Sequence, residues 1–343
     1  MLWPSGPGAF RLWLALMVVV HHITRIEVGK APVLVFFALS GYWVRLVWAS
    51  RYVHCRRPWL TFIISRWWRV APVTVLASGL SLLVYWGLNH PDWGLIRHDG
   101  AVQAVAPFAL LGYGQLAIKP LGSAWSLDVE MQFYLVAPLL IGMVGRLSAV
   151  SVVALGALCF IWAIGMHWVA VLPVFLIFFL LGLLAAQHAW RVSAAMGGAG
   201  MGVALGWLLL CALGPDRHRW LSEGGDLSSF LNLGLGVCLL PFALYSVTGK
   251  SDRGDRAMGD SSFLLYLLHW PLILVLRYGP WAESSVLLGG IVIAPLAVYS
   301  VWRWYDRPLD RLRASWVKSR ILRDNGAGQG AARKKGDTPA HFA

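Results

Sequence analysis

Arg11 and His22 stand eleven residues apart in an otherwise apolar stretch near the start of the chain. Eleven residues of α-helix make about three turns, or roughly 16 Å, so both side chains share one face about half a bilayer apart. A charged group inside hydrocarbon is costly, so such a pair must face protein, water or ligand. A guanidinium can stabilise developing negative charge, and an imidazole can accept a proton. We therefore predict that Arg11 and His22 belong to a functional site.

Arg66 and Arg69 form a second pair with spacing that suits chemistry. They are i,i+3 neighbours on one predicted helical face, and Pro72 follows them at the start of an apolar block. Two guanidiniums on one face match phosphate oxygens bidentately, which suits a nucleotide-like anion such as coenzyme A. The alternative is that both arginines simply anchor the helix at the cytoplasmic membrane surface.

Two further pairs lie on later apolar blocks. Glu130 and Tyr134 are i,i+4 neighbours near one end of a predicted span. Glu130 could orient an imidazole or hold an acceptor's hydroxyls, or it could simply face water. Tyr266 and His269 are i,i+3 neighbours in the middle of another block. A lone helical histidine is often a satisfied core residue, but its depth in the membrane favours a function.

The composition is that of a membrane protein. Of the 343 residues, 58% are hydrophobic and only 13% are charged, which is about half the charged fraction of a soluble domain. The apolar residues come in repeated blocks of about 18–20 residues, the length of a membrane-spanning helix. We predict an all-α integral membrane protein with about ten transmembrane helices in one bundle. The predicted spans are 9–25, 32–49, 69–88, 127–145, 148–166, 169–188, 197–214, 229–248, 262–279 and 285–303.

The distribution of basic residues predicts the orientation. Residues 44–69 hold six arginines and no acid, which places this connection in the cytoplasm. With ten spans, the N- and C-termini are both cytoplasmic. A further apolar segment, 101–118, is short and contains Pro107 and two glycines. We interpret it as a re-entrant or interfacial piece of an external loop, because an eleventh span would place the C-terminal tail outside.

The chain divides at about residue 309. Residues 1–309 form the predicted membrane domain, and residues 310–343 form a basic cytoplasmic tail, disordered beyond about residue 324 because it lacks apolar periodicity. The net charge of +13 comes from basic loops and this tail, so we expect no nucleic-acid partner. The four cysteines are scattered without a CxxC pair, so they predict neither a disulfide framework nor a metal site.

Together and in order, these motifs resemble the membrane acyltransferase-3 family, integral-membrane O-acyltransferases that modify bacterial polysaccharides, lipid-linked sugars and some antibiotics. The resemblance covers about residues 8–309. Two positions differ: the family often has an acid where this chain has Phe10, and a glutamate where it has Asp306. The matching segments are Arg11-x10-His22, VFFALSGYW (35–43), Arg66-x2-Arg69-x2-Pro72, Trp125-Ser126-Leu127-x2-Glu130-x2-Phe133-Tyr134-x3-Pro138 and Ser262-x3-Tyr266-x2-His269-x-Pro271.

The resemblance implies an enzyme that transfers acyl groups other than amino-acyl groups. The implied donor is acyl-coenzyme A, most simply acetyl-coenzyme A, and no cofactor is bound permanently. Succinyl and longer acyl groups stay open. The implied acceptor is a hydroxyl of a cell-surface or lipid-linked saccharide, and the protein is expected in the lipid of the bacterial inner membrane. Some members carry an additional soluble hydrolase-like domain, and we expect this chain to be the stand-alone form.

The resemblance also implies roles for individual residues. His22 would be the main catalytic base, which removes the acceptor's hydroxyl proton while the oxygen attacks the thioester carbonyl. Arg11 would stabilise the oxyanion or orient the donor, and Glu130 would assist. A histidyl-acyl intermediate is an equally valid alternative. Arg66 and Arg69 would bind the donor. The further candidate site residues are Ser40, Trp125, Tyr134, Tyr266 and His269.

Two other classes of protein compete with this interpretation. A transporter or flippase of a lipid-linked or anionic substrate also needs charged residues at the membrane midplane, but it usually shows internal repeat symmetry, and none is visible here. A membrane scaffold explains the tryptophans and basic loops. It gives no reason for Arg11 and His22 to share an apolar span.

Overall fold

The computed structural model describes residues 6–24, 26–98, 100–164, 170–222, 225–249, 251–279 and 293–321. The regular elements in these ranges are all helical, and Cys55 and Ile321 form an isolated β-bridge. The helices are α1 (Pro7–Ile23), α2 (Lys30–Ser50), α3 (Pro58–Gly87), α4 (Trp93–His98), α5 (Gly100–Ala109), α6 (Trp125–Val144), α7 (Ala149–Ile164), α8 (Leu172–Gln187), α9 (Ala194–Leu213), α10 (Arg217–Leu221), α11 (Gly225–Val247), α12 (Arg253–Tyr278) and α14 (Arg307–Arg320).

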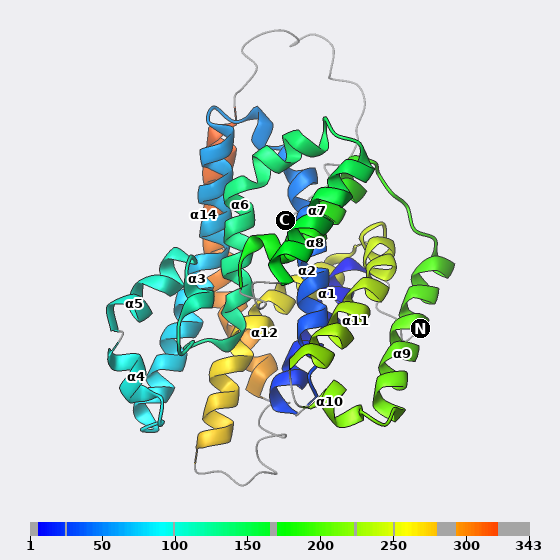
Figure 1. The fold of residues 1–343 in the computed structure, drawn as a ribbon. Coiled ribbons are helices and arrows are strands. Elements are labelled where there is room, and N and C mark those ends of the chain that lie inside the picture. The colour runs from blue at the N-terminus through cyan, green and yellow to red at the C-terminus, as the bar shows by residue number, and fades with distance from the viewer. Residues whose placement is uncertain are drawn as a thin grey trace.

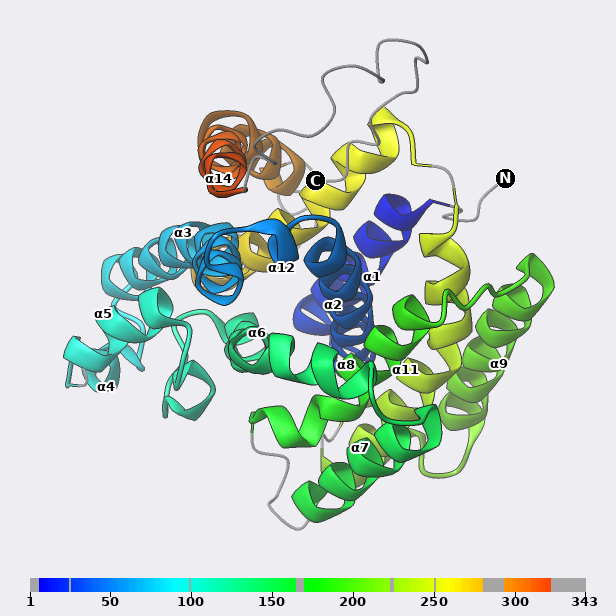
Figure 2. The same ribbon diagram turned by 90° about the horizontal axis from the view of Figure 1, so that it is seen from above.

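The predicted all-α fold is confirmed for the described residues. Six of the helices in the described part are long and apolar enough to cross a membrane, and α1, α7 and α8 are shorter apolar helices. Figures 1 and 2 show α1 and α2 at the centre of the bundle, with α3 and α14 on one side and α9 and α11 on the other. The number of ten spans stays a prediction. Part of the predicted last span, 285–303, lies outside the described residues, as does the tail beyond residue 321.

Helices α1 and α12 are distant in sequence but run parallel and in register. Asp255, near the start of α12, accepts hydrogen bonds from the backbone N–H groups of Gly8 (3.0 and 3.1 Å) and Ala9 (2.9 Å). These donors have no partner within their own helix, because the first turn of a helix leaves its N–H groups free. The carboxylate also complements the positive end of the α1 dipole. Asp255 therefore fixes the position of α1 against α12.

The α1–α12 contact is close because glycines line it. A Cβ atom added at Gly8 would overlap the backbone carbonyl of Asp255, and one added at Gly259 would overlap the guanidinium of Arg11. Small residues let two membrane helices approach backbone to backbone, where dispersion forces and polar contacts hold them together. The same device recurs where α2 crosses α8, since Gly41 and Gly182 each face the other helix's backbone.

The segment 101–118 does not form one spanning helix. Its helical part, α5, ends at Ala109, and ten residues of helix reach only about 15 Å, half the thickness of the hydrocarbon. Leu110 and Gly112 have positive φ angles of 55° and 78°, which turn the chain. The loop after them folds inward, and the carboxylate of Asp128 accepts a hydrogen bond from the Gly114 N–H (2.8 Å). Whether this segment enters the membrane stays a prediction.

The chain continues as a helix beyond the last predicted span. Residues 293–301 are helical and lead into a π-helical turn, Trp302–Asp306, and then into α14. Figures 1 and 2 show α14 lying alongside α3. The side chain of Arg313 is buried between them and bonds to Ser65 (2.9 Å). The first part of the region expected as a tail is therefore a packed helix.

The glycine contact between α2 and α8 gives a stability prediction. Gly182→Leu places side-chain atoms where the Ala38 carbonyl lies, and overpacking a close contact costs about 1–3 kcal/mol or more. We expect a lower Tm in detergent by intrinsic tryptophan fluorescence. Gly206→Leu on α9 is the matched control, since its Cβ meets no atom within 4 Å. Equal Tm values for the two variants would contradict the packing described here.

Candidate active site

His22 and His269 lie together where α1 packs on α12. Their ring centroids are 5.2 Å apart with an interplanar angle of 25°, and the Trp270 ring stands edge-on to His22 at 5.0 Å. His269 is 2% exposed. Its Nδ1 lies 3.0 Å from the Leu265 carbonyl, which can only accept, so Nδ1 carries the proton. The Nε2 lone pair of His269 is buried without a hydrogen-bond partner in the described part of the chain.

His21, the neighbour of His22, faces a different element. Its Nδ1 is 3.1 Å from the backbone carbonyl of Ile26, and its ring lies against Gly29 in the loop between α1 and α2. The two histidines diverge because successive residues of a helix point about 100° apart. Of the two, only His22 has ring contacts with α12.

Arg11 also faces α12, but it lies near the start of α1, whereas His22 lies near its end. Its guanidinium lies over Gly259, and its Nε donates a hydrogen bond to the Pro7 carbonyl (3.3 Å). Asp255 and Asp260 are within electrostatic range. The prediction that Arg11 and His22 share one helix face is confirmed, since both contact α12. They do not touch, because three turns of helix, about 16 Å, separate them.

Ser40, Glu130 and Tyr134 form a hydrogen-bonded triad between α2 and α6. The Glu130 carboxylate accepts hydrogen bonds from the Ser40 hydroxyl (2.7 Å) and the Tyr134 hydroxyl (2.5 Å). Such bonds are charge-assisted and stronger than those between neutral groups. Glu130 is therefore engaged by two hydroxyl donors, although its side chain stays partly exposed.

Arg66 sits in an aromatic cage at the end of this triad. Its guanidinium carbon lies 5.5 Å, 5.8 Å and 5.9 Å from the ring centroids of Phe62, Tyr52 and Tyr134. Cation–π attraction of this kind strengthens when the cation is removed from water. Glu130 is within electrostatic range of Arg66. The Nε of Arg66 is buried without a hydrogen-bond partner in the parts of the chain described.

Arg69 takes a different partner from Arg66. It forms an ion pair with Asp306 (2.7 Å) and lies over the Phe263 ring of α12 (5.0 Å). The two arginines, three residues apart on α3, therefore have different partners. A shallow hollow beside Arg69 is lined by Trp68, Asp306 and Asp310.

Tyr266 lies on α12 between the histidines and the start of α6. Its hydroxyl is 2.6 Å from the Ser126 hydroxyl and donates to the Ser123 carbonyl (2.9 Å). Its ring contacts Phe36, one turn before Ser40, and lies 6.3 Å from His269, one turn further along α12. Glu130 is within electrostatic range of Tyr266.

Trp125, also a candidate site residue, lies elsewhere. Its ring packs against Phe37 of α2 (6.5 Å) and Phe175 of α8 (5.5 Å). These contacts belong to an aromatic cluster that continues through stacked Phe179 and Phe133 rings (4.1 Å). Trp125 therefore packs the helix that carries Glu130, and the structure gives it no contact with the histidines or with Arg66.

The candidate site thus consists of two groups of polar side chains, which we together call the polar file. Contacts join Arg66, Tyr134, Glu130 and Ser40 in one group and Ser126, Tyr266, His269 and His22 in the other, and Glu130 is within electrostatic range of Tyr266. The motifs contained Ser126, but its spacing gave no reason to select it. Tyr52 and Asp255 had no local signal, because their roles depend on contacts between distant segments.

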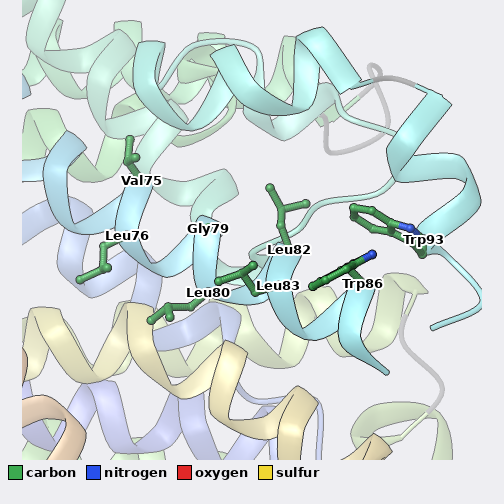
Figure 3. A pocket seen from close by; sticks show the side chains of 8 residues that line it. All are labelled: Val75, Leu76, Gly79, Leu80, Leu82, Leu83, Trp86 and Trp93. Atoms are coloured by element: carbon green, nitrogen blue, oxygen red, sulfur yellow. The ribbon is translucent and has the colours of Figure 1, made fainter. Parts of the chain in front are cut away.

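An apolar hollow on the surface of the bundle is a different feature. It is a groove on α3 and α4, and Figure 3 shows the apolar side chains and tryptophans that line it. It contains no titratable group, so it cannot carry acid–base chemistry. Its lining residues are Val75, Leu76, Gly79, Leu80, Leu82, Leu83, Trp86 and Trp93.

The chain is similar to proteins of a known family. The family model of acyltransferase 3, described as an acyltransferase domain, matches residues 6–302. Nodulation protein 10 of Rhizobium leguminosarum bv. viciae is 26% identical to this chain in an alignment of 340 positions, gaps included. The alignment covers 85% of each chain. No solved structure matches this chain. The family match ends before α14 begins and contains every member of the polar file.

Proposed function

This chain belongs to the acyltransferase-3 family, and on that premise we propose that it transfers an acyl group from acyl-coenzyme A to a saccharide hydroxyl. The family and the apolar helices make it a membrane acyltransferase. We infer that the acyl group is acetyl, that the acceptor is a cell-surface or lipid-linked glycan, and that the membrane is the bacterial inner membrane. The observation that carries the proposal is the polar file from Arg66 to His22.

The two ends of the polar file suit the two substrates. A coenzyme A donor is anionic through its phosphates, and the cationic end at Arg66 can hold such a group. A neutral sugar hydroxyl needs a base, and the His22–His269 pair offers two imidazoles, of which His269 is buried and His22 is partly exposed. The hydroxyls of Tyr134, Ser40 and Tyr266 between these ends offer hydrogen bonds without charge. Such groups line a path through hydrocarbon at lower cost than ions do.

The direction of the helices supports two-sided access. Helices α1 and α12 run parallel, since Gly8 meets Asp255 at one end and His22 meets His269 at the other. If α2, α3, α6, α7, α8, α9 and α11 each cross once, α12 is the ninth crossing and must run parallel to α1. A crossing within 101–118 would make the two helices antiparallel. With the arginine-rich connection at 44–69 in the cytoplasm, Arg66 is on the donor side and His22 towards the outside.

The proposed reaction needs one proton acceptor near the thioester. An imidazole nitrogen of His22 removes the acceptor's hydroxyl proton, and the oxygen forms a bond to the thioester carbonyl carbon. The carbon–sulfur bond then breaks, and the thiolate takes the proton from His22, which yields the ester and free coenzyme A. His269 offers its unpartnered Nε2 as a hydrogen-bond acceptor for the incoming hydroxyl or for His22.

The remaining site residues act at a distance from this step. Glu130 is engaged by Ser40 and Tyr134, so we propose that it orders the middle of the polar file rather than removing a proton. Arg11 is about three helix turns from His22. We therefore propose that Arg11 orients the donor and that other groups stabilise the oxyanion. A transporter is not favoured, because the acyltransferase match extends over residues 6–302.

Replacing each of the adjacent histidines tests the assigned base. We expect His22→Ala to lower the rate of acceptor acylation about 10²–10⁴-fold, the usual contribution of a general base. His21→Ala is the matched control and should retain activity, because His21 faces the loop at Ile26. The measurement is transfer of radiolabelled acetyl from acetyl-coenzyme A in membranes with equal protein levels. Equal activity in both variants would remove His22 from the mechanism.

The donor-binding assignment predicts different outcomes for the two arginines. Arg66→Lys keeps the charge but loses the planar fork, so we expect the KM for acyl-coenzyme A to rise about tenfold. Arg69→Lys can keep its ion pair with Asp306, so we expect a smaller rise. Titrating the donor at fixed acceptor concentration measures both values. An unchanged KM in Arg66→Lys would contradict donor binding and favour the alternative that Arg66 only anchors its helix at the membrane surface.

Topology reporters test whether the donor and acceptor sites open to opposite sides. A reporter fused after Lys119 should read external, and one fused after Arg323 should read cytoplasmic, because 101–118 does not span in the proposed topology. Paired alkaline phosphatase and fluorescent protein fusions at each site give the two readouts. A cytoplasmic signal at Lys119 would require the trans-bilayer path to be given up, although membership of the acyltransferase family would stand.

A further inference from the structure

We propose that Arg313 of α14 joins Arg66 to bind the phosphate groups of the acyl donor. This inference rests on the proposed function, and it adds a donor-binding residue that lies beyond the family match, which ends at residue 302. The argument begins with the position of α14, which packs on the first half of α3, where Ser65 and Arg66 lie.

Arg313 is buried and reaches the helix that carries Arg66. Its Nη1 donates to the Ser65 hydroxyl (2.9 Å), while its Nε and Nη2 donate to Asp310 on the same helix (3.0 and 2.6 Å). Ser65 also accepts a hydrogen bond from the Tyr52 hydroxyl (2.7 Å), and the Tyr52 ring is one wall of the cage around Arg66. Arg313 is therefore connected to the cage through one shared serine.

The two guanidiniums are close enough to repel each other. Arg66 and Arg313 are within electrostatic range; the Arg313 side chain is buried, and so is the Nε atom of the partly exposed Arg66. Like charges in a low-dielectric place are costly unless an anion lies near them. Asp310 compensates Arg313 directly. Within the described chain, Arg66 has no carboxylate oxygen within 4 Å, and the Glu130 carboxylate is engaged by two hydroxyls.

The unsatisfied donor shows where an anion would bind. The Nε of Arg66 is buried without a partner, and leaving such a group unpaired costs about 1–3 kcal/mol or more for a charged group. A phosphate oxygen supplies both the missing acceptor and the missing negative charge, and two guanidiniums can share one phosphate or bridge a pyrophosphate. The ligand class is thus a phosphate-bearing nucleotide, which coenzyme A satisfies. Arg69 is also paired with a carboxylate, Asp306, but its contacts are with Asp306 and Phe263, away from the serine that joins Arg313 to the cage.

Calorimetric titration of the detergent-purified full chain with unacylated coenzyme A tests the inference without catalysis. We expect Arg313→Gln to weaken coenzyme A binding about tenfold or more, the effect of losing one charge-assisted bond. Arg313→Lys should recover part of this loss. Arg311→Gln is the matched control on the exposed face of α14, and it should bind with unchanged affinity.

Asp310→Asn separates anion binding from a structural clamp, because the two roles predict opposite results. If Arg313 binds phosphate, removing the negative charge of Asp310 should leave coenzyme A affinity unchanged or raise it. If Arg313 only clamps α14 to α3, Asp310→Asn should weaken binding as Arg313→Gln does, and that result would overturn the inference. Equal coenzyme A affinity in Arg313→Gln and in the wild-type protein would overturn the inference about Arg313 and leave the proposed function intact. A wild-type protein that binds no coenzyme A would overturn both the inference and the proposed function.

Discussion

The register between α1 and α12 is the constraint on which the rest of the site depends. The Asp255 carboxylate holds the free N–H groups of Gly8 and Ala9, and the same offset along the two helices brings His22 against His269. A buried helix terminus without partners is costly, and the Asp255 carboxylate supplies partners at one register of the two helices. One capped helix end therefore sets the position of the proposed base several turns away.

Local sequence predicted the helices because the bilayer imposes their length and apolar character. It also predicted that Arg11 and His22 share a face, which depends only on helix geometry. It did not separate Arg66 from Arg69, whose partners come from different segments. Asp306 lies 237 residues after Arg69, and no local pattern shows whether Arg66 or Arg69 will pair with Asp306.

Contacts between distant segments also explain what the sequence left out. Asp255 lies near a helix end, and Arg313 lies beyond the last predicted span. A charged residue at such a position is ordinarily expected to face water. Only the fold shows that Asp255 is 7% exposed and Arg313 6% exposed, with partners 247 and 248 residues away. Proximity along the chain identified the motifs, whereas the groups that position them become visible once the helices are packed.

On the proposed function, the distribution of charge along the polar file suits a site inside a membrane. Moving a phosphate across hydrocarbon is costly, so the anionic part of the proposed donor would stay at the cationic end near Arg66. Only an uncharged arm would then have to reach the histidines, and Tyr134 and Tyr266 lie between the two ends. Glu130 is the one acid in the middle, and its two hydroxyl donors supply hydrogen bonds that water would otherwise give. On the proposed function, the protein therefore binds charge at one end and performs proton transfer at the other.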